Sequence, residues 1–343
     1  MATPSFASSY NFTNTLNSLN RDHSLTDYII DVVFQSMKGL NFLRQREMVD
    51  EIDGGLAATW TINVGKSPNT VWYAGDQDLP IGSLNNNVYT AALDWKFLDD
   101  ALTVLFTDVL MNDGSPDAVA NYVAAQLDIT KMSAVQALAT AWITNTFLAN
   151  PLAVDGLQGS IDNGTVVPTY AGIPVTAGAV GSLWGAANSV NYNITSTSSL
   201  LANLQTLDIA AQIDSSRPDF YMTNRLCYGS IIGALTSLDR YIQPDLARTT
   251  GSVDVSFNSG PLFIDSNVPT GVVSPQTGSG SGGAIFGLNS RYLKLVVLRG
   301  AYFEIEEWQK SQQNNTYFTR IHFGGNVINF KPAAHWQAWV SGQ

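Results

Sequence analysis

Two runs of alternating apolar and polar residues, joined by a turn-rich segment, constrain the fold most. The outgoing run covers 56–64 and the return run 89–97, and the apolar residues that alternate in them are Trp60, Ile62 and Val64, then Tyr89, Ala91, Leu93, Trp95 and Phe97. A period of two is typical of β-strands, and the Gly, Pro, Asn and Asp residues of 66–87 favour turns. The pattern therefore predicts a long two-stranded hairpin. Because an isolated hairpin is only marginally stable in water, we expect it to lie on another body, the neighbouring subunit.

A long helix is predicted downstream of the hairpin. Ser115-Pro116-Asp117 combines a capping residue, a proline suited to the first helical position and an acid near the positive end of the helix dipole. Apolar residues then recur at helical spacing from Val119 to Phe147, and Asn150-Pro151 ends the pattern. At 1.5 Å per residue such a helix is about 50 Å long, so we expect it to form the spine of the fold.

The remaining elements are short and indicate an α+β chain. The polar residues 1–24 are typical of an extended arm, and we expect a short helix over 25–37 that Gly39 ends. Further helices are predicted over 198–213 and 224–241, and further strands at 220–222, 253–257, 261–265, 285–298, 317–323 and 327–330. Helices and antiparallel strands thus segregate along the chain, as they do in α+β folds.

The composition favours self-association. Hydrophobic residues make up 45% of the 343 residues and charged residues only 13%, about half the charged share of soluble globular chains. Such a surface is typical of a protein held in permanent interfaces; a neutral-surfaced secreted protein is the alternative. The net charge of −11 and the lack of a Lys/Arg cluster argue against a protein whose main task is to bind nucleic acid.

The sequence predicts a cytoplasmic site of synthesis. Residues 1–20 lack the basic head and apolar run of a signal peptide, and no apolar run approaches the roughly 20 residues that a membrane helix needs. We therefore expect no contact with a membrane. The single cysteine, Cys227, lies in an apolar stretch and is expected to be a small core residue.

No motif predicts a cofactor or a metal. The segment Gly278–Gly283 matches G-x-G-x-x-G, but a strand pattern follows it, whereas a dinucleotide-binding unit needs a helix there. The three histidines have no second ligand-type residue at metal-binding spacing, and we expect them to be ordinary polar residues of strands or of the arm; they are His23, His322 and His335.

Catalysis is not predicted either. A carbohydrate-active enzyme needs two carboxylates on opposite sides of a sugar. Glu304 and Asp94 are the candidate acids for such an enzyme, and the group Glu304, Glu306 and Glu307 lacks an opposing acid on a second element in the sequence pattern. A charged edge or interface is the simpler interpretation of these acids.

Four stretches follow these elements in a recognisable order. They are Ala91-Ala92-Leu93-Asp94-Trp95-Lys96, Asn150-Pro151-Leu152-Ala153-Val154-Asp155-Gly156-Leu157, Arg217-Pro218-Asp219-Phe220-Tyr221-Met222-Thr223 and Phe286-Gly287-Leu288-Asn289-Ser290-Arg291-Tyr292-Leu293. Each is weak alone, but their order and spacing, over nearly the whole chain, resemble the major capsid proteins of tailed bacteriophages, which have the Hong Kong 97-like fold.

The resemblance implies a domain organisation. It places an N-terminal arm and short helix at 1–50 and the extended hairpin, or E-loop, at 51–100. A peripheral domain with the spine helix would comprise 101–150 and 296–343, and an axial domain 151–295.

The resemblance also implies a function and a set of partners. A member of this family is no enzyme: it self-assembles into pentamers and hexamers that form the icosahedral head of the virion, in the host cytoplasm, and encloses double-stranded DNA without sequence-specific binding. A portal is implied, and a decoration protein is possible. The arm before Leu25 is too short and too uncharged for the scaffold-like segment of many relatives, so we expect a separate scaffolding protein or a processed chain.

The hairpin carries the residues that we expect to contact another subunit, namely Trp60, Lys66, Trp72, Tyr73 and Trp95. Some relatives cross-link a hairpin lysine to an asparagine, but no partner can be assigned to Lys66, which we expect to face solvent. Two other functions stay open: another virion component, such as a tail or decoration protein, and a carbohydrate-active enzyme.

Overall fold

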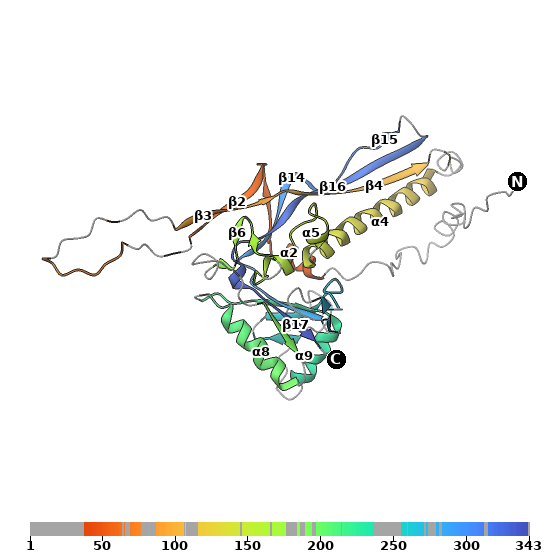
Figure 1. Ribbon diagram of the computed structural model, residues 1–343. Helices are drawn as coiled ribbons and strands as arrows, with labels where there is room; N and C mark the ends of the chain where they lie inside the picture. Colours follow the sequence, from red (N-terminus) through yellow and green to blue (C-terminus); the bar gives the residue numbers. More distant parts are fainter. Residues whose placement is uncertain are drawn as a thin grey trace. The chain divides into compact units, whose positions relative to one another are not determined.

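A computed structural model of the chain describes residues 38–63, 65, 69–76, 82, 87–105, 107, 116–144, 146–164, 167–175, 184–185, 189–193, 197–213, 215–235, 255–258, 260–270, 272–273, 279–280, 283–311 and 315–341. The helices, shown in Figure 1, are α2 (Lys38–Gln45), α4 (Pro116–Ile143), α5 (Thr146–Ala149), α6 (Leu157–Ser160), α8 (Thr197–Ala210), α9 (Arg225–Leu235) and the 3-10 helix η1 (Pro332–Ala334). No helix within these ranges is both long and apolar enough to span a membrane.

The strands complete an α+β chain, as predicted. They are β1 (Val49–Ile52), β2 (Ala57–Asn63), β3 (Val88–Asp94), β4 (Lys96–Leu105), β5 (Thr169–Tyr170), β6 (Ile173–Pro174), β7 (Ser189–Asn193), β8 (Phe220–Thr223), β9 (Val255–Phe257), β10 (Gly260–Ile264), β11 (Val272–Val273), β12 (Ser279–Gly280), β13 (Gly283–Leu288), β14 (Leu293–Ile305), β15 (Gln309–Lys310), β16 (Thr316–Asn329) and β17 (Trp336–Ser341).

The chain divides into two compact units. The first comprises Met1–Gln35, Phe97–Leu138 and Gly300–Phe323, and the second Ser36–Lys96, Ala139–Arg299 and Gly324–Gln343. Within the first, residues 1–35 lie outside the described part of the chain. The domain boundaries implied by the resemblance stay a prediction.

The first unit contains a sheet built around β16. This strand pairs with β4 and, in antiparallel orientation, with β15. Alternate residues of β16 are buried, including Thr319 and Ile321, while Arg320 and His322 point to the other, partly exposed face. The strand runs unbroken to Asn329 through Gly324-Gly325. The prediction of two strands, at 317–323 and 327–330, was therefore wrong, because the glycine pair extends the strand instead of ending it.

The predicted spine helix exists, but it is shorter than expected. The described part of α4 starts at Pro116, and its 28 residues correspond to about 42 Å; Ser115, the predicted cap, lies outside the described residues. The helix ends at Ile143, and the remaining residues form the separate turn α5. The cause lies further along the second unit: a Cβ on Gly156 would lie 1.8 Å from the carbonyl oxygen of Thr144. The backbone at Gly156 therefore occupies the space that a continuing helix would need.

The second unit contains a six-stranded sheet in the order β7-β17-β13-β8-β10-β9. Its core side chains come from α8 and α9 together with the strands, among them Leu204, Ile231, Tyr221 and Trp336. Figure 1 shows both helices against one side of this sheet. The two helices and the strand between them confirm the predictions for 198–213 and 220–222 and, as far as Leu235, for 224–241.

Two local predictions in this unit were wrong. Gly39 does not end a helix, because it lies in the first turn of α2, where its N–H donates to Asp265 Oδ2 at 2.7 Å; the helix expected over 25–37 lies outside the described residues. The single strand expected at 285–298 is two strands, β13 and β14. The turn between them is fixed by Asp219, which accepts hydrogen bonds from the Ser290 N–H, at 2.8 Å, and from its hydroxyl.

Candidate subunit interface

The predicted hairpin is present in the second unit. β2 and β3 pair in antiparallel register, with Ala57 opposite Asp94, Trp60 opposite Ala91 and Asn63 opposite Val88. The return strand ends earlier than expected, at Asp94, because the chain then enters β4 and pairs with β16 instead. Phe97 is therefore not a hairpin residue.

The root of the hairpin packs against its own chain. On its inward face Ala58, Ile62, Ala91 and Leu93 are buried. They belong to one cluster with residues of β5, of the turn after it, and of β6, β14 and β16, namely Tyr170, Ala171, Ile173, Val296 and Ile328. The N–H of Ala92 also donates to the carbonyl of Ala171 at 3.1 Å. Burial of alternate residues on one face explains the period of two in the sequence.

Two of the predicted contact residues, Trp60 and Trp95, lie at this root. The ring of Trp60 meets Phe330 edge to face, with centroids 5.6 Å apart, a favourable geometry for two aromatic rings. The indole N–H of Trp95 donates to the carbonyl oxygen of Gly55 at 2.8 Å. Both side chains are half-buried against their own subunit and keep part of their surface in solvent.

A polar network fixes the end of the hairpin. Asn326 Nδ2 donates to the carbonyl of Asp94 at 3.0 Å and to Asp155 Oδ2 at 2.7 Å, and its Oδ1 accepts the N–H of Asp155 at 3.1 Å. Lys96 Nζ donates to the carbonyl of Pro151 at 2.6 Å. Burial raises the pKa of Asp155, while the Asn326 hydrogen bond acts in the opposite direction. These contacts tie the end of β3 and the following Lys96 to Asn326 and to the segment that contains Pro151 and Asp155.

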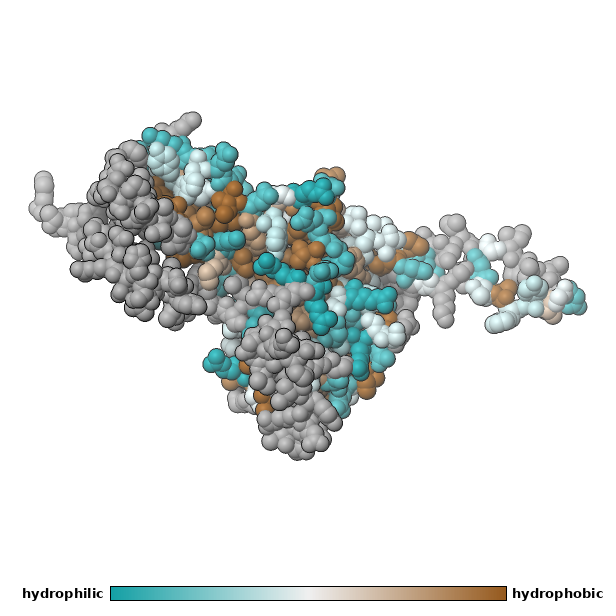
Figure 2. Space-filling model, turned by 180° about the vertical axis from the view of Figure 1, so that it is seen from behind, coloured by the Kyte–Doolittle hydropathy of each residue, from teal (hydrophilic) through white to brown (hydrophobic). Residues whose placement is uncertain are grey.

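The described tip of the hairpin has a different character. Trp72 and Tyr73, two further predicted contact residues, are 102% and 62% exposed, and their neighbour Val71 is 47% exposed. Figure 2, in which the hairpin projects to the right, shows apolar residues lying among polar ones on it. Soluble monomers rarely keep neighbouring large apolar side chains in water. Lys66 lies outside the described residues, and Val71 was missed because it belongs to no alternating run.

The residues considered for chemistry belong to other segments of the chain than the hairpin tip. His335 is buried, and burial lowers its pKa to about 3. Cys227 is buried in α9, as predicted, and burial raises its pKa to about 11. In the segment Gly278–Gly283 the short strand β12 pairs with β11, and β13 begins at Gly283, so a strand follows the glycines. His23 lies outside the described part of the chain.

The acidic candidates form no metal-type cluster within the described ranges. Glu304 is exposed at the end of β14, and Asp94 is exposed at the end of β3. Glu306 contacts His322, and Asp99 of β4 contacts the same ring. The expectation that no acid lies opposite Glu306 on a second element was therefore wrong. The sequence could not reveal this partner, because β4 and β16 meet only in the folded sheet.

No protein-family model matches the sequence, and no curated protein matches it. Solved structures do match in fold. An encapsulin, from the holo-SrpI complex of Synechococcus elongatus PCC 7942, superposes with a TM-score of 0.59 at 10% identity, over 96% of this chain and 95% of its own.

Two capsid structures give similar results. The capsid protein of cyanophage A-1(L) superposes with a TM-score of 0.59 at 13% identity, over 96% of this chain and 98% of its own. The capsid of a native GTA particle gives 0.56 at 11% identity, over 93% and 98%. Each match covers more than nine tenths of both chains. The protein therefore has the Hong Kong 97-like fold that capsid and encapsulin shell proteins share.

Proposed function

We propose that this chain is the major capsid protein of a tailed bacteriophage. Copies of it assemble into pentamers and hexamers, which form an icosahedral head around double-stranded DNA. The observation that carries the proposal is the match in fold, over more than nine tenths of both chains, with the capsids of cyanophage A-1(L) and of a GTA particle. At 9–13% identity this match concerns the fold, so the function needs its own support.

The hairpin supplies that support. Its root packs on its own subunit, whereas Val71, Trp72 and Tyr73 at its tip lie in water. Aromatic side chains at the centre of an interface often contribute most of its free energy of binding. We infer that Trp72 and Tyr73 lie against a neighbouring copy, that the exposed parts of Trp60 and Trp95 extend this contact, and that Lys66 belongs to the same surface.

The proposal includes further partners and a location. The head needs a portal and, in this reading, a separate scaffolding protein, and a decoration protein is a possible addition. Assembly takes place in the host cytoplasm, and the product is part of the virion. The chain carries a formal net charge of −11, which suits a wall that encloses DNA without gripping its phosphates. We propose no catalytic activity.

A shell of the encapsulin kind is the second candidate, because the encapsulin superposes with the same TM-score as the cyanophage capsid, 0.59. Particles isolated from the natural source distinguish the two. Nuclease-resistant double-stranded DNA inside them supports a phage head. Particles that lack DNA and hold a second protein support the encapsulin-type shell.

Self-assembly is tested on the purified chain by sedimentation velocity and negative-stain electron microscopy, with and without the candidate scaffolding protein. We expect rings or closed shells. A chain that stays a single soluble unit at high concentration under both conditions contradicts the proposal, and tubes instead of shells favour a tail protein.

The role of the hairpin tip is tested with the double variant Trp72→Ser, Tyr73→Ser. Loss of a central aromatic contact typically costs about 2 kcal/mol or more, which corresponds to about 30-fold weaker association per contact. Thr70→Ala is the matched control, since Thr70 is a neighbouring exposed residue without a large apolar side chain. Both variants should unfold like the wild type in urea. If the double variant assembles at the same protein concentration as the wild type, the hairpin tip is not part of the interface.

A further inference from the structure

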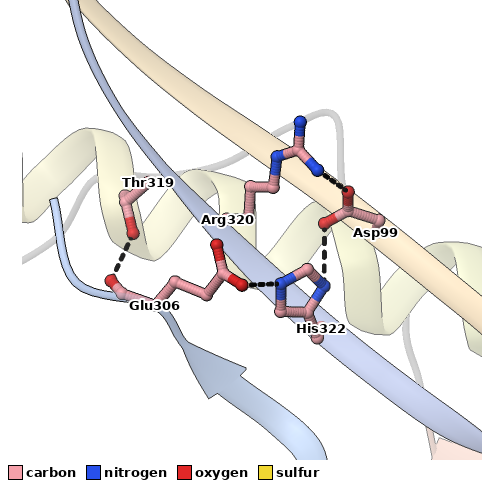
Figure 3. Close-up of polar contacts among 5 residues, drawn as sticks. All are labelled: Asp99, Glu306, Thr319, Arg320 and His322. Atoms are coloured by element: carbon pink, nitrogen blue, oxygen red, sulfur yellow. Dashed lines mark hydrogen bonds and ion pairs between the residues drawn. The ribbon is translucent and has the colours of Figure 1, made fainter. Parts of the chain in front are cut away.

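Four ionisable side chains meet on one face of the sheet in the first unit (Figure 3). His322 of β16 lies with Nδ1 3.1 Å from Asp99 Oδ1 on β4 and with Nε2 2.8 Å from Glu306 Oε1. Arg320, two residues earlier on β16, places Nη1 3.5 Å from Asp99 Oδ2. The imidazole therefore lies between two carboxylates that come from two other segments of the sheet.

The backbone holds Glu306 in this position. Its N–H donates to the carbonyl of Arg320 at 2.9 Å, and its own carbonyl accepts the hydroxyl of Thr319 at 2.6 Å. The Thr319 side chain that makes this second contact is buried in the sheet. Glu306 follows the last residue of β14, and its contact with His322 thus joins this segment to β16 through side chains as well as through the backbone.

The protonation state of His322 decides how many of these contacts can form. An ionised carboxylate only accepts hydrogen bonds, and neutral imidazole has a single N–H, whereas imidazolium has two. Both contacts therefore require the protonated ring. Among the described residues, the charged groups in ion-pair contact with the ring or its acids are Asp99 from β4, Glu306 from the segment after β14 and Arg320 from β16 itself. With the ring protonated, two positive charges balance two negative ones.

We propose that Asp99, Glu306, Arg320 and His322 form a proton-operated clasp that fastens β4 and the segment after β14 to β16. Within the described residues β16 is the one strand that β4 pairs with, so the clasp acts where the sheet has an edge. The clasp is closed while His322 carries its proton. When the pH rises and the proton leaves, one ring nitrogen turns a lone pair toward a carboxylate, and that side of the clasp opens.

The sign follows from which form makes the contacts. Histidine side chains ordinarily change charge between about pH 5 and 8. The clasp is therefore closed toward the acid end of this range and loosened toward the alkaline end. All four side chains are partly in solvent. Screening by water keeps each ion pair weak, so the effect is local to β4 and the segment after β14.

Hydrogen exchange of the unassembled full chain tests the clasp. Exchange is compared at pH 5.5 and pH 8, after correction for the intrinsic rate at each pH, in peptides that cover β4 and 306–311. In the wild type we expect protection to fall about twofold to fivefold on going to pH 8, the range that exposed ion pairs support. The side chain introduced by His322→Gln has one amide donor group and does not titrate. In this variant we expect protection from exchange at both pH values to match the lower protection of the wild type at pH 8.

Two further variants keep the result decisive. Glu306→Gln should lower the protection of 306–311 from hydrogen exchange at pH 5.5 while β4 stays protected. This variant replaces His322→Gln as the test if His322→Gln does not fold. Arg299→Gln is the matched control, because it breaks an exposed ion pair with Asp53 that contains no histidine, and it should keep the wild-type pH dependence. Equal pH dependence in wild type and His322→Gln, or none in the wild type, overturns the proposal.

Discussion

His335 is expected to make the subunit less stable in acid, because the fold holds this ring in its neutral form. The residue follows η1 and is fully buried, and its Nδ1 accepts the N–H of Asn289 at 3.1 Å. With Nδ1 as an acceptor, the proton of the neutral ring is assigned to Nε2. Burial lowers the pKa of His335 to about 3, since a charged ring would lose its hydration inside the core.

The size of the effect follows from linkage between protonation and folding. A histidine in an unfolded chain titrates near 6.5, so the unfolded state takes up the proton first as the pH falls. The stabilising contribution of the neutral ring is complete above about pH 6.5 and is lost progressively toward pH 3. Because one pKa unit corresponds to about 1.4 kcal/mol, the loss at pH 3 is of the order of 4 kcal/mol. That is a large share of the 5–15 kcal/mol typical of a folded domain.

The assay compares the wild type with His335→Asn by urea unfolding between pH 7 and pH 4, at concentrations where the chain is unassembled. The Asn Oδ1 can accept the N–H of Asn289 but does not titrate. We expect the variant to be less stable at pH 7, through lost packing, and to lose stability less steeply with acid.

The carboxylates titrate in both proteins, so their effect cancels in the difference. Between pH 6 and pH 4 the two free energies of unfolding should converge by about 1.4 kcal/mol per pH unit. Parallel curves would refute the reasoning, since His335 would then contribute nothing to the acid sensitivity.

Three further outcomes are expected from buried contacts in the second unit. A Cβ at position 287 would lie 2.2 Å from the ring of Trp336, so Gly287→Ala should lower the free energy of unfolding by about 1–3 kcal/mol in urea, and an unchanged value would contradict this packing. Cys227 should react with a thiol reagent only as fast as the chain unfolds, because burial raises its pKa to about 11; rapid reaction of the native chain would contradict it. Asn326→Ala should cost about 2–4 kcal/mol, since it leaves the partly buried Asp155 without its amide donor, and urea unfolding of Asn326→Ala beside the wild type measures the loss.

Periodicity predicted the elements whose burial alternates along their own sequence. The hairpin is an example: Ala58, Ile62, Ala91 and Leu93 are buried on one face, and their spacing in the sequence shows it directly. The helix that contains α4 was predictable for a similar reason, because its apolar residues recur at helical spacing along their own sequence.

The errors arose where contacts between distant residues decide the local structure. Gly39 is a glycine because a Cβ there would lie 2.8 Å from the sulfur of Met222 and 2.9 Å from the ring of Trp142. From the sequence alone the same residue is predicted to end a helix, since glycine is common at helix ends. α4 ends early because the backbone at Gly156 meets its last turn. Neither neighbour can be identified from spacing along the chain.

The same distinction separates the two ends of the hairpin. At the root, alternation in the sequence and burial in the structure agree, because the strands pack on their own subunit. At the tip, the large side chain of Trp72 is fully exposed. An aromatic side chain in water adds no hydrophobic stabilisation to the isolated fold. We propose that the free energy that keeps such a residue at this position comes from a surface that the described residues do not provide. The exposed tip, together with a fold shared with shell proteins, is therefore the reason to look for that surface on a second copy.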